Sequence, residues 1–183
     1  MNLWEFSLSV YGKSGVPDAC LTLQNSHGLD VNLVLFCLWL ATDSRCLAGT
    51  EVKEAIALSD AWRQKMISPL RALRTEMKAW PSEESVSAFS RRTDFEELRN
   101  KVKAVELEAE KWQQQMLTSL VGRSQTSEDD DLVGFSASLD LIAAQSKNRE
   151  RARNELIIAI ADAHSDDFGK KVRSVLSSLQ SNR

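Results

Sequence analysis

The stretch that decides the fold is residues 31–41, VNLVLFCLWLA. Apart from Asn32 every residue in it is apolar, so a helix formed here has no polar face to turn toward water. A helix that is hydrophobic all round lies at the centre of a bundle. The run covers 11 residues, whereas a membrane-spanning helix needs about 20. We therefore expect a buried central helix from Val31 to about Arg45 and no membrane span.

Amphipathic helices are expected on both sides of this central helix, because apolar residues recur there every three or four positions. Asn2 is suited to cap the first of them, and Pro69 should kink another. The predicted helices are 3–11, 16–27, a kinked 50–80 and 93–121. The pattern predicts an all-α, single-domain helical bundle. Its core is 1–123, an acidic mobile loop follows at 124–131, and the C-terminal helices of 132–183 pack on the core.

The longest periodic signal lies in 93–121, where apolar residues are spaced alternately three and four apart. These residues are Phe95, Leu98, Val102, Val105, Ala109, Trp112 and Met116. Such a heptad seam must pack against another long helix. The partner is either the 50–80 helix of the same chain or the same segment of a second copy, which would make a homodimer. The first is favoured because antiparallel helices joined by a short connection are the common arrangement.

Polar residues crowd just ahead of the central helix, in residues 24–32, QNSHGLDVN. Gly28 should end one helix and Asp30 should cap the next, which explains most of the cluster without any chemistry. His27 and Asn32 are left over, and a structural role is favoured for them because buried polar groups need partners. The alternative is a small-molecule pocket at this helix elbow. Its floor would be His27, Asp30 and Asn32, and its wall Trp4 or Trp39.

A basic stripe runs along the second half of the 50–80 helix. It consists of Arg71, Arg74 and Lys78. Such stripes are ordinarily solvated faces whose aliphatic stems cover apolar surface. The alternative is a contact site for an acidic partner, and we predict contact with another protein at these three residues.

Composition excludes several classes of function. The chain has 183 residues, 26 acidic and 23 basic, with a net charge of −3 and no strongly basic segment, so nucleic-acid binding is disfavoured. Its two histidines lack the ligand spacing of a metal site, and no phosphate-binding or nucleophile motif occurs. We therefore predict no catalytic residue, no metal and no cofactor. Three cysteines without CxxC spacing favour a reducing cytoplasm. A non-enzymatic adaptor or regulator is the first interpretation, and a small-molecule-binding protein or enzyme with its pocket at the elbow is the alternative.

Residues 3–41, LWEFSLSVYGKSGVPDACLTLQNSHGLDVNLVLFCLWLA, together with Trp62 and the PLRALR stretch of 69–74, resemble an uncharacterised proteobacterial domain-of-unknown-function family. The similarity covers roughly residues 3–120. The resemblance implies a helical, cytoplasmic bacterial protein. It implies no particular activity, cofactor or catalytic residue at any position of this chain.

Overall fold

The computed structural model describes residues 1–43, 45, 47–79, 92–121, 138 and 150–181. Among these residues there are helices and no strands, so the predicted all-α fold is confirmed. They form two compact units. The first comprises Met1–Ser59 and Gln114–Arg183, and the second comprises Asp60–Gln113. The predicted acidic loop, 124–131, lies outside the described residues.

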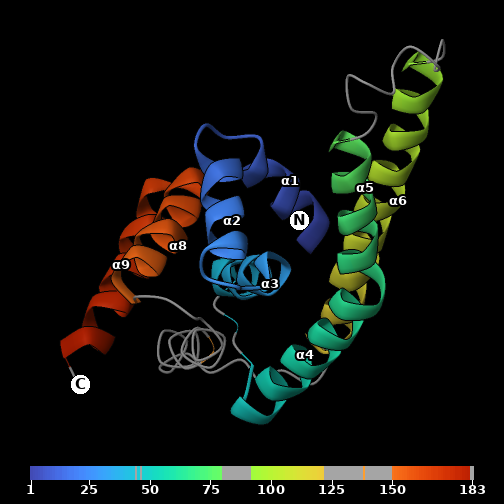
Figure 1. Ribbon diagram of the computed structural model, residues 1–183. Helices are drawn as coiled ribbons and strands as arrows, with labels where there is room; N and C mark the ends of the chain where they lie inside the picture. The colour runs from blue at the N-terminus through green and yellow to red at the C-terminus, as the bar shows by residue number, and fades with distance from the viewer. Residues whose placement is uncertain (44, 46, 80–91, 122–137, 139–149, 182–183) are drawn as a thin grey trace. The chain divides into compact units, whose positions relative to one another are not determined.

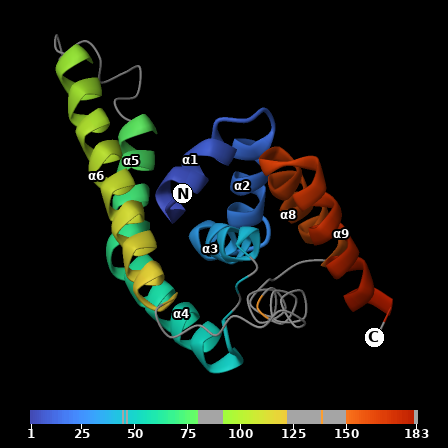
Figure 2. The same cartoon turned by 180° about the vertical axis from the view of Figure 1, so that it is seen from behind.

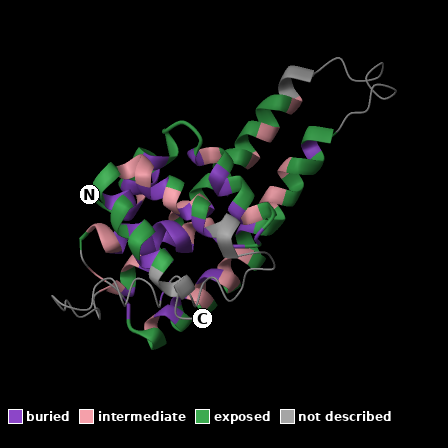
Figure 3. Ribbon diagram, turned by 90° about the vertical axis from the view of Figure 1, so that its left-hand side faces the viewer, coloured by how far each residue is buried: buried purple, intermediate pink, exposed green. Residues whose placement is uncertain are grey.

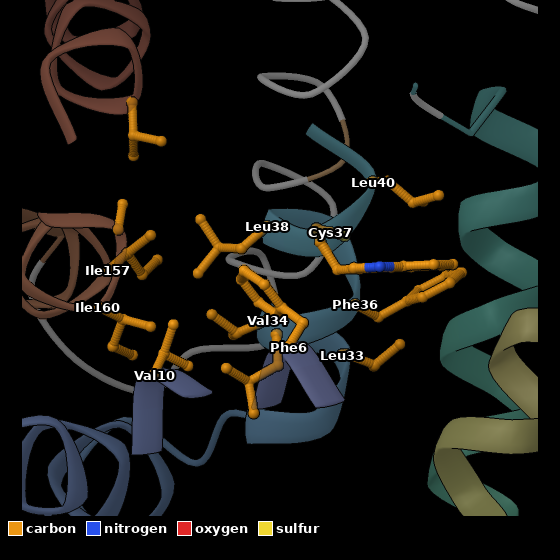
Figure 4. Packing of buried hydrophobic residues seen from close by; sticks show 14 of the residues in the cluster. Phe6, Val10, Leu33, Val34, Phe36, Cys37, Leu38, Leu40, Ile157 and Ile160 are labelled. Atoms are coloured by element: carbon orange, nitrogen blue, oxygen red, sulfur yellow. The ribbon is translucent and has the colours of Figure 1, made fainter. Parts of the chain in front are cut away.

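The core of the first unit forms around α3 (Val31–Thr42), which is buried on every side from Leu33 to Leu40. Two helices, α1 (Leu3–Tyr11) and α2 (Val16–Asn25), pack on α3, and α8 (Glu150–His164) packs on both of them. Figure 4 shows Ile157 and Ile160 of α8 close to Leu38 and Val34 of α3. The prediction of a central apolar helix is thus confirmed, and its physical reason is that only enclosure removes all of its faces from water.

Local capping explains where the first three helices begin and end. Asn2 accepts from the amide of Glu5 at 2.9 Å, and the Glu5 carboxylate accepts in return from the Asn2 amide at 3.0 Å, which is a complete capping box. Gly28 has a φ of 70° in the turn after α2. The amide of Leu29 donates to the carbonyl of Leu23 at 3.1 Å and closes that turn. The cap predicted at Asn2 is therefore present. Gly28 has the expected left-handed conformation, but α2 ends earlier than predicted, at Asn25 with Ser26 as its C-cap.

The C-terminal helices α8 and α9 (Asp166–Ser181) lie alongside each other in the first unit (Figure 1). Their approach is close at Gly169, where an added Cβ would lie 1.6 Å from the Oδ1 atom of Asp162. At the turn between them the ring of His164 contacts two aromatic rings. Its centroid lies 5.2 Å from that of Phe6 in α1 and 5.5 Å from that of Phe168 in α9. The close packing of α9 on α8 thus depends on a position without a side chain.

The second unit contains the end of α4 (Gly49–Trp62), the π-helical turn η1 (Arg63–Ile67), α5 (Ser68–Ala79) and the part of α6 (Arg92–Ser119) that ends at Gln113. The π turn comes directly before Pro69, whose ring clashes with the carbonyl four residues earlier in a regular α-helix. In the wider turn, the amide of Ser68 donates to the carbonyl of Arg63 instead. The predicted kink therefore takes the form of a π turn, and the helix continues through it.

The predicted pair of long helices is confirmed, because α5 and α6 (Arg92–Ser119) run antiparallel and side by side in both views (Figures 1 and 2). The expected seam of α6 is only half correct. Ala109 is buried, but Leu98, Val105 and Trp112 are exposed. Glu106 is buried in the position expected for Val105, since two arginines of α5 bind its carboxylate. The packed face of α6 therefore includes the ion-paired Glu106 and is rotated from the purely apolar seam that was expected.

Candidate functional site

At the elbow, the carboxylate of Asp30 joins two helices of the first unit. Its Oδ1 atom accepts from the amide of Asn32 at 2.9 Å and so caps α3, as predicted. Its Oδ2 atom accepts from the hydroxyl of Ser59 in α4 at 2.6 Å. Both Asp30 and Ser59 are buried. The carboxylate therefore acts as a helix cap and as a tie between α3 and α4.

A second set of hydrogen bonds extends from Asn32. Its side-chain oxygen accepts from the Nε2 atom of Gln114 in α6 at 2.8 Å. The same amide nitrogen donates to the hydroxyl of Ser7 in α1 at 3.0 Å, and that hydroxyl donates to the carbonyl of Leu3 at 2.8 Å. Asn32 thus has the partner that its place in an apolar run demands, and the resulting chain of bonds holds three helices together.

Neither Ser59, Gln114 nor Ser7 was predicted as part of the elbow. Ser59 shares the buried face of its helix with Val52 and Ala55, so a hydroxyl there required a buried acceptor. Gln114 lies in the run of three glutamines at 113–115, which interrupts the apolar pattern of α6. The sequence therefore shows that these polar groups are unusual where they stand. Sequence spacing does not show that Ser59 binds Asp30 or that Gln114 binds Asn32.

His27 occupies the turn between α2 and α3 and is buried. Its Nδ1 atom has no hydrogen-bond partner among the described residues. The three residues expected to form the pocket floor are close in sequence. Asp30 and Asn32 are joined by a hydrogen bond, whereas the Nδ1 atom of His27 bonds to neither of them. This ring nitrogen is thus a buried polar atom at the elbow whose hydrogen-bonding capacity the described side chains leave unused.

The two tryptophans expected as pocket walls lie in different places. Trp39 is seven residues beyond Asn32 in α3, which is about 10 Å along the helix axis. Its indole nitrogen donates to the carbonyl of Met1 at 3.0 Å, its ring stacks on Phe36, and the Arg45 guanidinium lies 4.9 Å from the ring centroid. Trp39 is thus engaged away from the elbow. Trp4 is half-buried in α1, one turn before the network member Ser7.

In the second unit, the predicted basic stripe faces α6. Arg71 donates to Glu106 at 2.9 Å and to Glu110 at 2.7 Å, and Arg74 donates to both carboxylate oxygens of Glu106. Lys78 is exposed. Two members of the stripe therefore hold α5 against α6.

The charges in this cluster reinforce one another. Burial by itself would raise the pKa of Glu106, but hydrogen bonds from Arg74 and Arg71 and their positive charges outweigh it, and the pKa lies below its ordinary value of 4.5. The hydrogen bond to Glu106 raises the pKa of Arg74 in turn. The carboxylate is therefore ionised at neutral pH, and the cluster is an internal ion-pair network.

Large apolar side chains are exposed along the same pair of helices. We call Met66, Leu73, Leu98, Val105 and Trp112 the apolar face; each is between 42% and 54% exposed. Figure 3 shows exposed residues in green along α5 and α6. Arg71 and Glu110 meet on one side of the helix pair. Leu73 follows Arg71 by two residues, and Trp112 follows Glu110 by two residues. Two residues correspond to about 200° around a helix, so both apolar side chains lie toward the other side of the pair.

The members on α6 are seven residues apart, so they form a stripe that drifts only about 20° per heptad. Met66 of η1 and Leu73 of α5 form a second stripe on the neighbouring helix. The indole nitrogen of Trp62 donates to the carbonyl of Ala109 at 2.9 Å between the two stripes. Half-exposed apolar side chains of this size therefore lie on one side of the helix pair.

Two observations concern metal binding and the reactivity of the thiols. No group of three or more histidine, cysteine, aspartate or glutamate side chains among them could hold a metal ion. Burial raises the pKa of the Cys20 thiol and of the Cys37 thiol to about 12, so both remain protonated at neutral pH and are poor nucleophiles. Within the ranges that the structure describes, no helix is long and apolar enough to cross a membrane.

The fold and its two polar clusters thus define an all-α protein with one internal hydrogen-bond network in each unit. The chain belongs to the family described as "Protein of unknown function (DUF2390)", whose pattern matches residues 2–117. That range includes α1 to α5 and nearly all of α6 and ends before α8. No curated protein and no solved structure matches the chain.

Proposed function

We propose that this protein is a non-enzymatic interaction module, an adaptor or regulator, that binds another polypeptide through the helix pair of its second unit. The observation that supports the proposal is the apolar face, five large side chains on one side of α5 and α6. Leaving large apolar side chains in water costs free energy, and a group of them on one side of a protein often marks a surface that binds another polypeptide. A bacterial, cytoplasmic location is part of the same proposal and is consistent with the free, buried thiols of Cys20 and Cys37.

The second unit is built to present this face rigidly. The ion pairs of Arg71 and Arg74 with Glu106 fix α5 against α6 on one side of the pair. Toward the other side, the indole nitrogen of Trp62 donates a hydrogen bond to the Ala109 carbonyl of α6. A preformed surface binds with a smaller loss of conformational entropy than a flexible one. Partner contact through Arg71, Arg74 and Lys78 stays a prediction. Lys78, the exposed member, is its most direct test, because Lys78→Glu leaves the internal ion pairs intact.

The test is site-specific photocrosslinking in cells that express the full chain. A photoreactive phenylalanine analogue replaces Val105 in one variant and Lys103 in the control. Lys103 is also exposed on α6 but lies about 200° away around the helix. We expect a discrete polypeptide adduct from position 105 that is several-fold weaker from position 103. Equal labelling at both positions, or no adduct at 105, would refute the proposal.

A small-molecule-binding role at the elbow is the second candidate, and the unpaired Nδ1 atom of buried His27 is the observation that favours it. A ligand there would have to form one hydrogen bond with that nitrogen, either as the donor or as the acceptor. The test is native mass spectrometry of the gently purified chain. A small bound mass that disappears in His27→Ala but persists in Trp39→Phe would support this function, and an unmodified mass of 20.5 kDa would argue against it.

A further inference from the structure

The stripe on α6 is nearly symmetric about its middle residue. Leu98 lies seven residues before Val105 and Trp112 lies seven after it, and all three are about half exposed. Turning the helix end for end about Val105 therefore places Leu98 of one copy opposite Trp112 of the other. Large apolar side chains then meet at every level of the stripe, which is the self-complementarity that a two-fold interface requires.

The same rotation brings exposed charges of opposite sign together beside the stripe. Lys101 lies between Leu98 and Val105 on this face, four residues before the middle, and Glu108 lies between Val105 and Trp112, three residues after it. In an antiparallel pair of α6 helices, Lys101 of each copy comes within one residue of the level of Glu108 of the other. A parallel pair would instead place Lys101 and Glu108 of the two copies on opposite flanks of the seam, so that neither meets its counter-charge.

We propose that the apolar face binds a second copy of this chain, so that two α6 helices cross antiparallel about a two-fold axis at Val105. The inference rests on the proposed function and names its partner. Met66 and Leu73, on the neighbouring helix, flank the crossing and widen the apolar contact. Ten large side chains, five from each copy, leave water together. The result is a four-helix arrangement in which the internal ion pairs of each copy lie on the outer sides.

The first experiment is sedimentation equilibrium of the full chain from about 1 to 100 µM, a range that detects the affinities common for interfaces of modest size. We expect a monomer–dimer equilibrium that Val105→Asp shifts to monomer. The matched control, Lys103→Asp, should leave it unchanged. Both positions are exposed, so circular dichroism should show the same helix content for both variants. A wild-type chain that stays monomeric throughout the range would overturn the inference.

The second experiment tests the antiparallel register by exchanging charges. Lys101→Glu and Glu108→Lys should each weaken dimerisation about tenfold, because each change makes two symmetry-related contacts repulsive. The double variant Lys101→Glu/Glu108→Lys should recover most of the loss. Three variants that weaken the dimer additively, without recovery, would overturn this arrangement.

The photocrosslinking experiment separates failure of this inference from failure of the proposed function. An adduct of position 105 with the chain itself, at twice the mass of one copy, supports both. An adduct with a different polypeptide supports the interaction function and refutes the second copy as the occupant. Equal labelling of positions 105 and 103 refutes both.

Discussion

Removal of the elbow carboxylate is the sharpest test of what the elbow does. In Asp30→Ala the amide of Asn32 loses its cap, which costs about 1 kcal/mol of unfolding free energy. The buried hydroxyl of Ser59 loses a charged acceptor at 2.6 Å, which costs about 2 kcal/mol. The sum, about 3 kcal/mol, corresponds to a fall in Tm of about 6 to 12 °C for a chain of this length.

The assay is urea unfolding followed by circular dichroism at 222 nm, with three matched variants. Asp30→Ser retains a capping side chain and should lose only about 2 kcal/mol, and Ser59→Ala should lose a similar amount because it leaves one carboxylate oxygen unpaired. In the double variant the two losses should overlap rather than add. If Asp30→Ala is within about 0.5 kcal/mol of wild type, the carboxylate does not stabilise the fold and its geometry must serve a ligand instead.

Three further predictions follow from packing and ionisation. Gly169→Ala should lower the unfolding free energy by about 1 to 3 kcal/mol because its Cβ meets the carboxylate of Asp162; a Gly169→Ala/Asp162→Ala double variant measured by thermal unfolding should recover much of the loss. The pKa of Glu106 is lowered in the fold, so its stabilisation is present above the unfolded value of 4.5 and is lost as pH falls through the folded value; Glu106→Gln should remove that part of the acid dependence of Tm, and an unchanged profile would contradict the ion-pair network. Cys20 and Cys37 should resist iodoacetamide at pH 7.5 and react in urea, as read by mass spectrometry; fast labelling of either in the folded protein would contradict their burial.

Much of the first unit could be predicted because the deciding physics is local. The apolar run from Leu33 to Leu40 has no polar face, so it must be enclosed wherever the rest of the chain lies. The capping residues Asn2 and Asp30 satisfy amides within three positions of themselves. Gly28 adopts a positive φ that other residues adopt at a cost. Helix type, the capped starts of α1 and α3 and the identity of the central helix therefore follow from neighbouring residues alone, whereas α2 and α3 end earlier than predicted, at Asn25 and Thr42.

The tertiary structure decided which polar groups meet. Asn32 needs a partner in any fold of this sequence, but only packing places the amide of Gln114, 82 positions away, at 2.8 Å. Periodicity could not show that Glu106 is buried between Arg71 and Arg74, because a heptad count ranks residues by hydropathy and cannot register a charge that is neutralised by another helix. Glu106 is ion-paired with residues 32 or more positions away and is buried, whereas the neighbouring Val105 is exposed on the surface on which the proposed function rests.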